Sequence, residues 1–288
     1  MSVSIIIINY NTFDYTKRCI ESVYLHTNDI DYEVILVDNG SNECDVEEFR
    51  KYFPQIKIVK NKENRGFSRA CNDGIAVAEK EYILLLNSDT LLLNNAIKVV
   101  YEFLRNNKEV GAATCRVENT DGTPQSVCRC FPTIKLTLIE LFRVFKLIDK
   151  DRRGTMFFGN WFSYDKIAYP DWITGTFFMF NREILKIFPN SKLTETFWMY
   201  YEDMEWCWHI KKNNYKVAFI PAGKILHYGK LSGNRKVHKL IKKNFYRFIF
   251  LYYNKVYATI LIILLELLEV SQILGKIKHF KIKSFLVN

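Results

Sequence analysis

The sequence lacks the short glycine motifs that mark several common enzyme classes. No Gly-x-Gly-x-x-Gly follows the first strand-like run, which disfavours a dinucleotide-binding site. Gly-x-x-x-x-Gly-Lys-[Ser/Thr] and Gly-x-Ser-x-Gly are also absent, so neither P-loop phosphoryl transfer nor an α/β-hydrolase is expected. The seven cysteines include no Cys-x-x-Cys pair, and an odd number fits a reducing cytosol better than a disulfide framework or a zinc site.

The sequence also has few long apolar runs. Residues 3–8 are too short for a secretion signal and no basic leader precedes them, so no signal peptide is expected. Beyond Lys230 the longest uncharged run is 256–265, and its 10 residues are about half of the ~20 that cross a bilayer. At 288 residues and 49% hydrophobic, the chain can still bury a sizeable core as one large domain, or as one domain plus an appendage.

Positive charge is concentrated toward the C-terminal end. The formal net charge is +10, but from Trp206 onward the chain has 16 Lys and Arg residues against two acidic ones. The remainder is slightly acidic, so a near-neutral body carries a basic end. Such an end predicts an anionic partner, and charge alone allows either a membrane surface or a nucleic acid.

Strand-like and helix-like segments alternate over residues 1–115. The apolar, mostly β-branched runs lie at residues 3–8, 33–38, 56–60, 82–86 and 110–115. Strands that alternate with helices predict right-handed crossovers and a mainly parallel sheet flanked by helices. The expected fold class is therefore α/β.

The second half of the chain has weaker periodicity. Residues 119–169 predict a flexible loop across the mouth of the site, with an apolar helix near 136–148. A further helix is expected within 197–212, and a last short strand at 216–220 before Pro221.

Polar side chains follow three of the predicted strands. Asn9 comes after the first, Asp38 after the second, and Asn87, Ser88 and Asp89 after the fourth. In a doubly wound sheet these strand ends converge on one crevice, where a carboxylate can hold a divalent cation against a diphosphate. Asp38 is also well placed to accept the imino N–H of a pyrimidine or a ribose hydroxyl. The alternatives are a turn at Asp-Asn-Gly-Ser and a helix N-cap at the acid after the fourth strand.

Several motifs together resemble the family 2 glycosyltransferases. They are Ile-Ile-Ile-Ile-Asn-Tyr-Asn at 5–11, Val-Asp-Asn-Gly-Ser at 37–41, Asn-Arg-Gly-Phe at 64–67 with Asn72, and Leu-Leu-Asn-Ser-Asp-Thr at 85–90. Residues 172–175 and 200–205 extend the resemblance, which covers 3–230 and is closest to the bacterial rhamnosyltransferase-like branch. It implies a GT-A fold, with a mainly parallel Rossmann-like sheet, and transfer with inversion of the anomeric centre.

The resemblance also implies which residues contact the donor and a metal. The implied nucleotide contacts are Asn9, Asn11, Asp38, Arg65, Gly66, Asn72, Asn87 and Ser88, with the base at Asp38. Asp89 corresponds to the metal-binding carboxylate of the DXD-type motif, and His227 to a position that contacts the metal or the diphosphate. Asn87 replaces the first acid of that motif, which leaves one strong carboxylate for Mn²⁺ or Mg²⁺. A purely structural role for His227 is the alternative.

The acidic cluster at residues 201–205 supplies the candidate catalytic base. Inverting transfer needs a carboxylate that removes the acceptor hydroxyl proton while charge grows on the leaving diphosphate. By resemblance, Asp203 occupies the position of this base, and Glu202 is its neighbour. The competing interpretation is that Glu202, Asp203 and Glu205 only stabilise the start of a helix through its dipole.

The expected domain organisation is a GT-A domain at 1–230 and a C-terminal tail at 231–288. The GT-A domain divides into a nucleotide-binding half at 1–115 and an acceptor or catalytic half at 116–230. The tail is basic, apolar and helical, and it either lies in the interface of an anionic membrane or packs on the body. The membrane interpretation places the protein in the cytoplasm, peripheral to the inner face of the plasma membrane.

The predicted function is sugar transfer from a nucleotide-diphosphate donor to a glycan or polyprenyl-linked glycan in bacterial surface polysaccharide synthesis. The resemblance favours dTDP-rhamnose as donor, and UDP-hexoses and UDP-N-acetylhexosamines are the alternatives. A nucleotide-sugar-binding protein without transferase activity is an alternative from another class. Nucleic-acid binding through the basic tail is not expected, because the sequence has no recognised module with a base-stacking platform.

Overall fold

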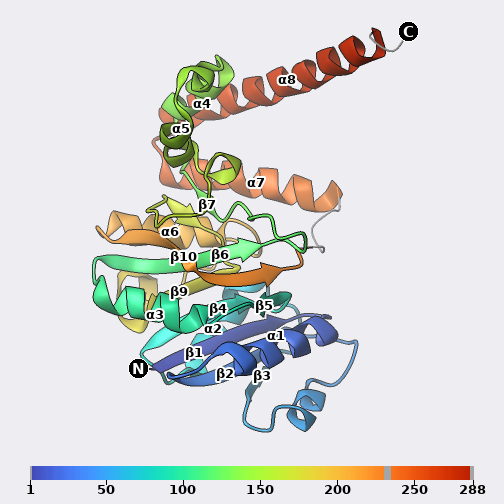
Figure 1. Cartoon of the computed structure of the whole chain (residues 1–288), viewed down its shortest axis with the longest axis vertical. Helices are drawn as coiled ribbons and strands as arrows, with labels where there is room; N and C mark the ends of the chain where they lie inside the picture. Colours follow the sequence, from blue (N-terminus) through green and yellow to red (C-terminus); the bar gives the residue numbers. More distant parts are fainter. Residues whose placement is uncertain (1, 230–234, 286–288) are drawn as a thin grey trace.

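The computed structural model describes residues 2–229 and 235–285, with a mixed sheet at its centre (Figure 1). The strands are β1 (Ser2–Asn9), β2 (Asp31–Asp38), β3 (Lys57–Lys60), β4 (Tyr82–Asn87), β5 (Thr90–Leu92), β6 (Val110–Glu118), β9 (Phe177–Asn181) and β10 (Lys216–His227). They lie across the sheet in the order β3-β2-β1-β4-β9-β6-β10-β5. A separate two-stranded ladder joins β7 (Cys128–Arg129) to β8 (Trp172–Ile173).

The sheet is mainly parallel, which confirms the predicted fold class. β1 pairs in parallel with β2 and β4, β2 with β3, and β6 with β10. β9 is antiparallel to β4 and β6, and β5 is antiparallel to β10. Consecutive residues Ile5, Ile6 and Ile7 of β1 are all inaccessible to solvent, as expected for a strand covered on both faces.

Helices cover both faces of the sheet. The helices α1 (Phe13–His26) and α3 (Ala96–Asn106) share one hydrophobic core with the sheet, and α2 (Phe67–Val77) and α6 (Glu202–Lys212) share the other. In α3 the apolar residues recur at helical spacing, and the Asn95 side chain caps the helix by accepting from the Lys98 backbone N–H. The buried residues of α3 are Ala96, Ile97, Val100, Tyr101 and Leu104.

The predicted loop over 119–169 contains a small helical lobe. We call residues 131–162 the α4–α5 lobe, because it contains α4 (Ile134–Leu141) and α5 (Lys150–Phe157). The single helix predicted at 136–148 is wrong, since α4 ends at Leu141 and only a short 3-10 turn follows. The cause of the break is Arg143, whose left-handed φ of 57° cannot continue an α-helix.

The last strand is also longer than predicted. The sequence predicted that it ends before Pro221, but β10 continues to His227. Its pairing with β6 is irregular between Ile220 and Lys224, and a proline is tolerated at such a site because no ladder hydrogen bond is needed there. As a result, His227 pairs with Thr90 at the far edge of the sheet.

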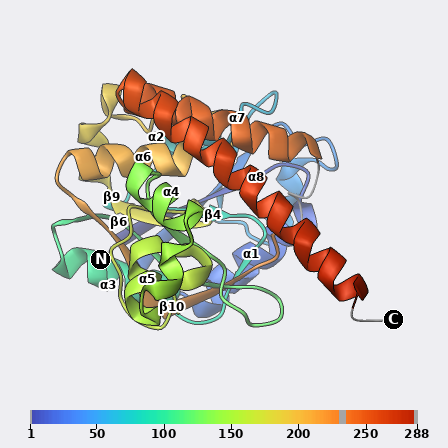
Figure 2. The ribbon, with the colours of Figure 1, turned by 90° about the horizontal axis from the view of Figure 1, so that it is seen from above.

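The predicted helical tail is present, and its two helices have different surroundings. In α7 (Arg235–Tyr252), Phe248 and Ile249 are fully buried, and Phe248 belongs to the same core as α6. α8 (Lys255–Phe285) packs on α4 and projects away from the body (Figures 1 and 2). By length and composition alone, Lys255–Leu274 could cross a membrane, and only 17% of its most apolar window is buried.

Candidate active site

The carboxyl ends of β2, β1 and β4 lie side by side. The strand register places Asn9 next to Asp38 and Ile8 next to Asn87. The Ser88 hydroxyl lies 3.2 Å from the Thr12 hydroxyl, which joins the turn after β4 to the loop after β1. The structure therefore brings together the polar strand ends that the sequence predicted to converge.

Asn9 and Asp38 form a buried hydrogen-bonded pair. Asn9 Oδ1 accepts from the hydroxyls of Thr12 (3.1 Å) and Thr16 (2.8 Å), so the amide nitrogen of Asn9 must face the other way. That nitrogen donates to Asp38 Oδ1 and to Ser41 Oγ, each at 3.0 Å. Because both side chains are buried, this network holds the Asp38 carboxylate in one orientation.

Asn11 connects the loops that follow β1 and β2. Its backbone is left-handed, with a φ of 53°. Its backbone N–H donates to Ser41 Oγ (3.0 Å), and its Oδ1 accepts from the Asn42 backbone N–H (2.9 Å). Asn11 is exposed at the rim of the crevice, beside the Asn9–Asp38 pair.

Asn39 is a residue of this crevice that the sequence analysis did not single out. It is 3% exposed, its Oδ1 accepts from the Arg65 backbone N–H (3.1 Å), and its amide nitrogen donates to Asn64 Oδ1 (3.0 Å). Gly66 follows with a φ of 83°, and a Cβ there would lie 2.4 Å from the Trp198 carbonyl oxygen. Only glycine fits this position. The sequence signal for Asn39 is its place directly after a buried strand.

Two of the implied nucleotide contacts, Arg65 and Asn72, form hydrogen bonds to other side chains and backbone groups of the protein. Arg65 Nη1 lies 2.7 Å from each carboxylate oxygen of Asp73. The Asn72 side chain is buried, donates to the Leu193 carbonyl (2.8 Å) and to Glu195 Oε1 (2.9 Å), and accepts from the Leu193 N–H (3.2 Å). The Asn72 amide thus anchors a distant segment, and the nucleotide contact that the resemblance implies for it stays a prediction.

Asp89 and His227 form the candidate metal site. Asp89 Oδ1 is 3.2 Å from His227 Nε2, and the two side chains are 13% and 14% exposed. The other ring nitrogen, Nδ1, is 2.8 Å from Gln125 Oε1. Gln125 Nε2 donates to the His227 carbonyl and to Asn119 Oδ1, so Gln125 Oε1 must be the acceptor for His227 Nδ1–H. The hydrogen-bond network thus assigns the proton of neutral His227 to Nδ1.

This tautomer directs the lone pair of His227 Nε2 at the Asp89 carboxylate. Two acceptors at this distance need a proton or a cation between them. Burial raises the pKa of Asp89, but the hydrogen-bond and charge interactions with His227 lower it by more and hold it below its ordinary value. A nitrogen and a carboxylate oxygen therefore fit a divalent cation such as Mn²⁺.

Few protein side chains are available as ligands at this candidate metal site. Within residues 2–229 and 235–285, no group of three or more His, Cys, Asp or Glu side chains is arranged to hold a metal. A cation at Asp89 and His227 would therefore take its remaining ligands from a diphosphate and from water, which is usual for Mg²⁺ at phosphate sites.

Asp203 lies at the first turn of α6 with its carboxylate fixed by backbone groups. Its Oδ2 accepts from the Gly175 N–H (2.9 Å), and its Oδ1 accepts from the Met204 N–H (2.8 Å). Burial raises the pKa of Asp203 to about 6, although these hydrogen bonds and the charge of nearby Arg129 act in the opposite direction. A carboxylate with this pKa is ionised at neutral pH and is a better proton acceptor than an ordinary aspartate.

A short backbone path connects Asp203 to the end of β4. Gly175, which donates to Asp203, is followed by Thr176, and the Thr176 carbonyl accepts from the Asn87 N–H at 3.1 Å. The antiparallel strand β9 starts two residues after Gly175 and pairs with β4. The fold thereby brings the acidic start of α6 to the same strand end that carries Asp89.

The Glu202 carboxyl has different surroundings from the Asp203 carboxylate. It is 6% exposed, and its Oε2 has no hydrogen-bond partner among the described residues. Burial and the neighbouring charge of Asp203 raise the pKa of Glu202 well above the usual range. The catalytic role that the resemblance implies for Glu202 stays a prediction.

The segment before α6 is held in an unusual conformation by α7. Tyr200 and Tyr201 are consecutive left-handed residues, with φ of 68° and 75°, which is costly for aromatic residues. Asn244 of α7 is buried and donates to the carbonyls of Met199 (2.9 Å) and Tyr200 (3.2 Å). The Tyr201 ring stacks on Phe245 at 5.4 Å. The sequence analysis missed Asn244, and its only signal was a lone amide within a basic stretch.

A comparison with solved structures identifies the class of the molecule. The fold is similar to that in the crystal structure of GalNAc-T7 with UDP, GalNAc and Mn²⁺, with a TM-score of 0.56 over 81% of this chain and 44% of that chain, at 14% sequence identity. The molecule has the GT-A fold, as predicted. The family follows from the sequence: the model of glycosyl transferase family 2 matches residues 4–188, and the chain belongs to this family.

Similar curated proteins are bacterial glycosyltransferases. Glycosyltransferase GlyG of Streptococcus pneumoniae is 31% identical over 105 residues, which are 35% of this chain and 34% of GlyG. The poly(ribitol-phosphate) beta-glucosyltransferase of Bacillus spizizenii is 29% identical over 133 residues, 44% of this chain and 21% of that enzyme. The chain thus spans about a third or less of the length of these relatives.

Proposed function

We propose that the chain is an inverting, metal-assisted glycosyltransferase that acts on a glycan or lipid-linked glycan in bacterial surface polysaccharide synthesis. The observation that carries this proposal is the position of Asp203, whose carboxylate is connected through Gly175 and Thr176 to the strand end that bears Asp89. A base and a metal-binding carboxylate on two sides of one site suit a single in-line displacement.

In the proposed mechanism Asp203 accepts the proton of the acceptor hydroxyl. The hydroxyl oxygen forms a bond to the anomeric carbon while the bond from that carbon to the diphosphate oxygen breaks. A divalent cation held by Asp89 and His227 would neutralise the charge that grows on the leaving diphosphate. Asp38 accepts the imino N–H of a pyrimidine base, and the Asn87 amide binds a ribose hydroxyl.

The donor in this proposal is a pyrimidine nucleotide sugar. dTDP-rhamnose is favoured by the sequence motifs, and UDP-hexoses and UDP-N-acetylhexosamines are the alternatives, because uracil and thymine present the same imino group to Asp38. The beta-glucosyltransferase among the relatives and the UDP in the similar crystal structure support a UDP-sugar as the alternative donor. The nearness of Asp203 to the Asp89 strand end supports catalysis over a binding protein without activity.

The proposed domain organisation keeps a nucleotide-binding half at 1–115 and a catalytic half at 116–230, and α7 completes the second half. The remaining tail and the α4–α5 lobe would bind the anionic inner face of the plasma membrane, with the enzyme in the cytoplasm. Exposed apolar side chains on α8 recur at helical spacing, at Val256, Ile260, Ile263, Leu267, Val270 and Leu274. Exposed basic side chains of the lobe are Lys135, Arg143, Lys146, Lys150 and Arg152.

Asn244→Ala is expected to lower kcat by ~10- to 100-fold with little change in KM for the donor, because the base would lose its exact position. The loss of the two hydrogen bonds that the buried Asn244 amide donates is expected to reduce stability by about 1–3 kcal/mol. Steady-state kinetics and thermal unfolding check both effects. The exposed neighbour Lys243 provides the control, since Lys243→Ala changes α7 without touching residues 199–201. Equal kinetics for the two variants would contradict a positioning role.

Calorimetry with UDP, dTDP and GDP, with and without Mn²⁺, tests the proposed function. We expect UDP or dTDP to bind more tightly than GDP and to need the metal, because Asp38 pairs with a pyrimidine and the metal bridges the diphosphate. A preference for uracil or for thymine reduces the number of candidate donor sugars. If none of the three nucleotides binds, the transferase proposal is wrong.

A further inference from the structure

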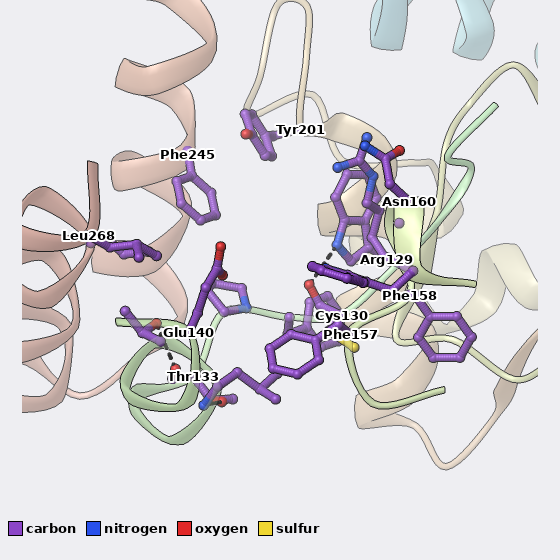
Figure 3. Close-up of a pocket in the computed structure, with 18 residues that line it drawn as sticks. Arg129, Cys130, Thr133, Glu140, Phe157, Phe158, Asn160, Tyr201, Phe245 and Leu268 are labelled. Atoms are coloured by element: carbon purple, nitrogen blue, oxygen red, sulfur yellow. Dashed lines mark hydrogen bonds between the residues drawn. The ribbon is translucent and has the colours of Figure 1, made fainter. Parts of the chain in front are cut away.

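A pocket of about 380 Å³ lies between the α4–α5 lobe and the two tail helices (Figure 3). One side of the lining comes from Arg129 and Trp172, and the other from Leu265 and Leu268 of α8. The Tyr201 ring, which stacks on Phe245 of α7, completes the lining. In Figure 3 the labelled side chains of Phe245 and Leu268 reach in from one side, and those of Arg129 and Asn160 stand on the other. The pocket therefore joins the segment before α6 to the helix that projects from the body.

The wall formed by β7, β8 and Tyr201 is polar and adjoins the catalytic carboxylate. Arg129 Nε donates to the Ser126 carbonyl at 3.1 Å, which directs the guanidinium, and the charge of Arg129 acts on Asp203. Tyr201 lies two residues before Asp203. Trp172 Nε1 donates to the Cys130 carbonyl at 3.1 Å, which holds its ring in the wall. A guanidinium in such a partly enclosed site is suited to phosphate oxygens.

The opposite wall is apolar and continues onto the exposed face of α8. Leu265 and Leu268 face the pocket, whereas Leu267 between them is 51% exposed. Glu140 is the acidic side chain of the lining, and it is held on the α8 side because its Oε1 accepts from Gln272 Nε2 at 3.1 Å. A ligand that enters along α8 therefore meets leucine and phenylalanine first and Arg129 last.

We propose that this pocket binds the phosphorylated end of a single-chain lipid that carries the acceptor. The phosphate lies at Arg129, the first groups of the chain lie among Phe245, Leu265 and Leu268, and the rest of the chain follows α8 into the bilayer. The volume holds roughly a dozen water-sized groups at ~30 Å³ each, which suits one chain and not the two chains of a phospholipid. The acceptor sugar attached to the phosphate then reaches Asp203. This inference rests on the proposed transferase function and adds the site of its lipid-linked substrate.

Binding of farnesyl diphosphate to the full chain in detergent micelles tests the pocket, with farnesol and inorganic diphosphate as partial ligands. We expect farnesyl diphosphate to bind at least tenfold more tightly than either partial ligand. Leu268→Trp fills the pocket, and Arg129→Gln removes the phosphate contact, so each is expected to weaken binding by about tenfold or more. Leu25→Trp places the same side chain at a 70% exposed position of α1, outside the pocket and the proposed membrane-binding surface, and is expected to leave binding unchanged.

Calorimetric titration of UDP and dTDP with Mn²⁺ on the same samples separates the two proposals. Intact nucleotide binding without farnesyl diphosphate binding overturns the lipid pocket alone, whereas lipid binding without nucleotide binding overturns the transferase function. Equal weakening by Leu25→Trp and Leu268→Trp would mean that the effect does not depend on the pocket, and it would also overturn the proposal. Competition by phosphatidylglycerol at equal concentration would assign the pocket to bulk phospholipid and reject a lipid carrier.

Discussion

Asp203→Asn is expected to reduce kcat by ~10³-fold or more, toward the upper range for the loss of a general base. The amide has nearly the same shape, and its oxygen can still accept from the Gly175 N–H, whereas its nitrogen cannot replace the acceptor of the Met204 N–H. The start of α6 should therefore keep its position with one hydrogen bond fewer. Binding of UDP or dTDP with Mn²⁺ should stay unchanged, because the proposed nucleotide contacts lie across the crevice on β1, β2 and β4. Steady-state transfer assays and calorimetry measure the two quantities.

The control for this variant is Asp29→Asn. Asp29 is 77% exposed, pairs with half-buried Lys98, and has a φ of 60° that asparagine adopts equally well. Its replacement should leave kcat within about twofold, since exposed ion pairs contribute little to stability. Transfer by Asp203→Asn at near wild-type rate would reject Asp203 as the base. Loss of nucleotide binding in that variant would show that the substitution disturbs the whole site.

The raised pKa of Asp203 also determines the pH profile. With a pKa of about 6, the carboxylate is mostly ionised above pH 7 and protonated below pH 5, so kcat/KM should fall as pH decreases through about 6. The same shift means that the folded protein binds this proton more tightly than the unfolded chain does. Its contribution to stability is therefore complete below the ordinary aspartate range and is lost as pH rises through about 6. Asp203→Asn should accordingly raise the melting temperature at pH 8.

Asp89→Asn and His227→Gln are each expected to weaken Mn²⁺-dependent nucleotide binding by at least ~100-fold, because each removes one of two protein ligands from the proposed metal site. A graded effect is expected from Gln125→Leu, which leaves both ligands but removes the acceptor that holds the His227 tautomer. Its cost in metal affinity should be ~10- to 100-fold, as is typical for groups that orient a ligand.

His238→Gln is the matched control, because His238 is exposed on α7 and lies outside the site. Calorimetry with UDP at several Mn²⁺ concentrations separates metal affinity from nucleotide affinity. If His227→Gln and His238→Gln bind Mn²⁺ and nucleotide equally well, His227 has a structural role and the metal proposal is wrong at that residue.

The sequence by itself determined the sheet and one side of the candidate site. Runs such as residues 5–8 and 83–86 are apolar on both faces, which is possible only in a covered parallel sheet, and the polar residues that follow them must then meet at one edge. This local reasoning was sufficient to bring Asn9, Asp38 and Asp89 together, because chain order and strand direction decide their place.

Only the tertiary structure determined which residues form the other side of the candidate site. The extension of β10 past Pro221 carries His227 to Gln125, which is 102 residues away in the chain. β9 brings Gly175 to Asp203, 28 residues away, and α7 brings Asn244 to Met199, 45 residues away. The structure also hydrogen-bonds Asn72 to Leu193, 121 residues away in the chain. These contacts depend on how distant segments pack and on which buried polar groups find partners, and no local pattern of residues records either.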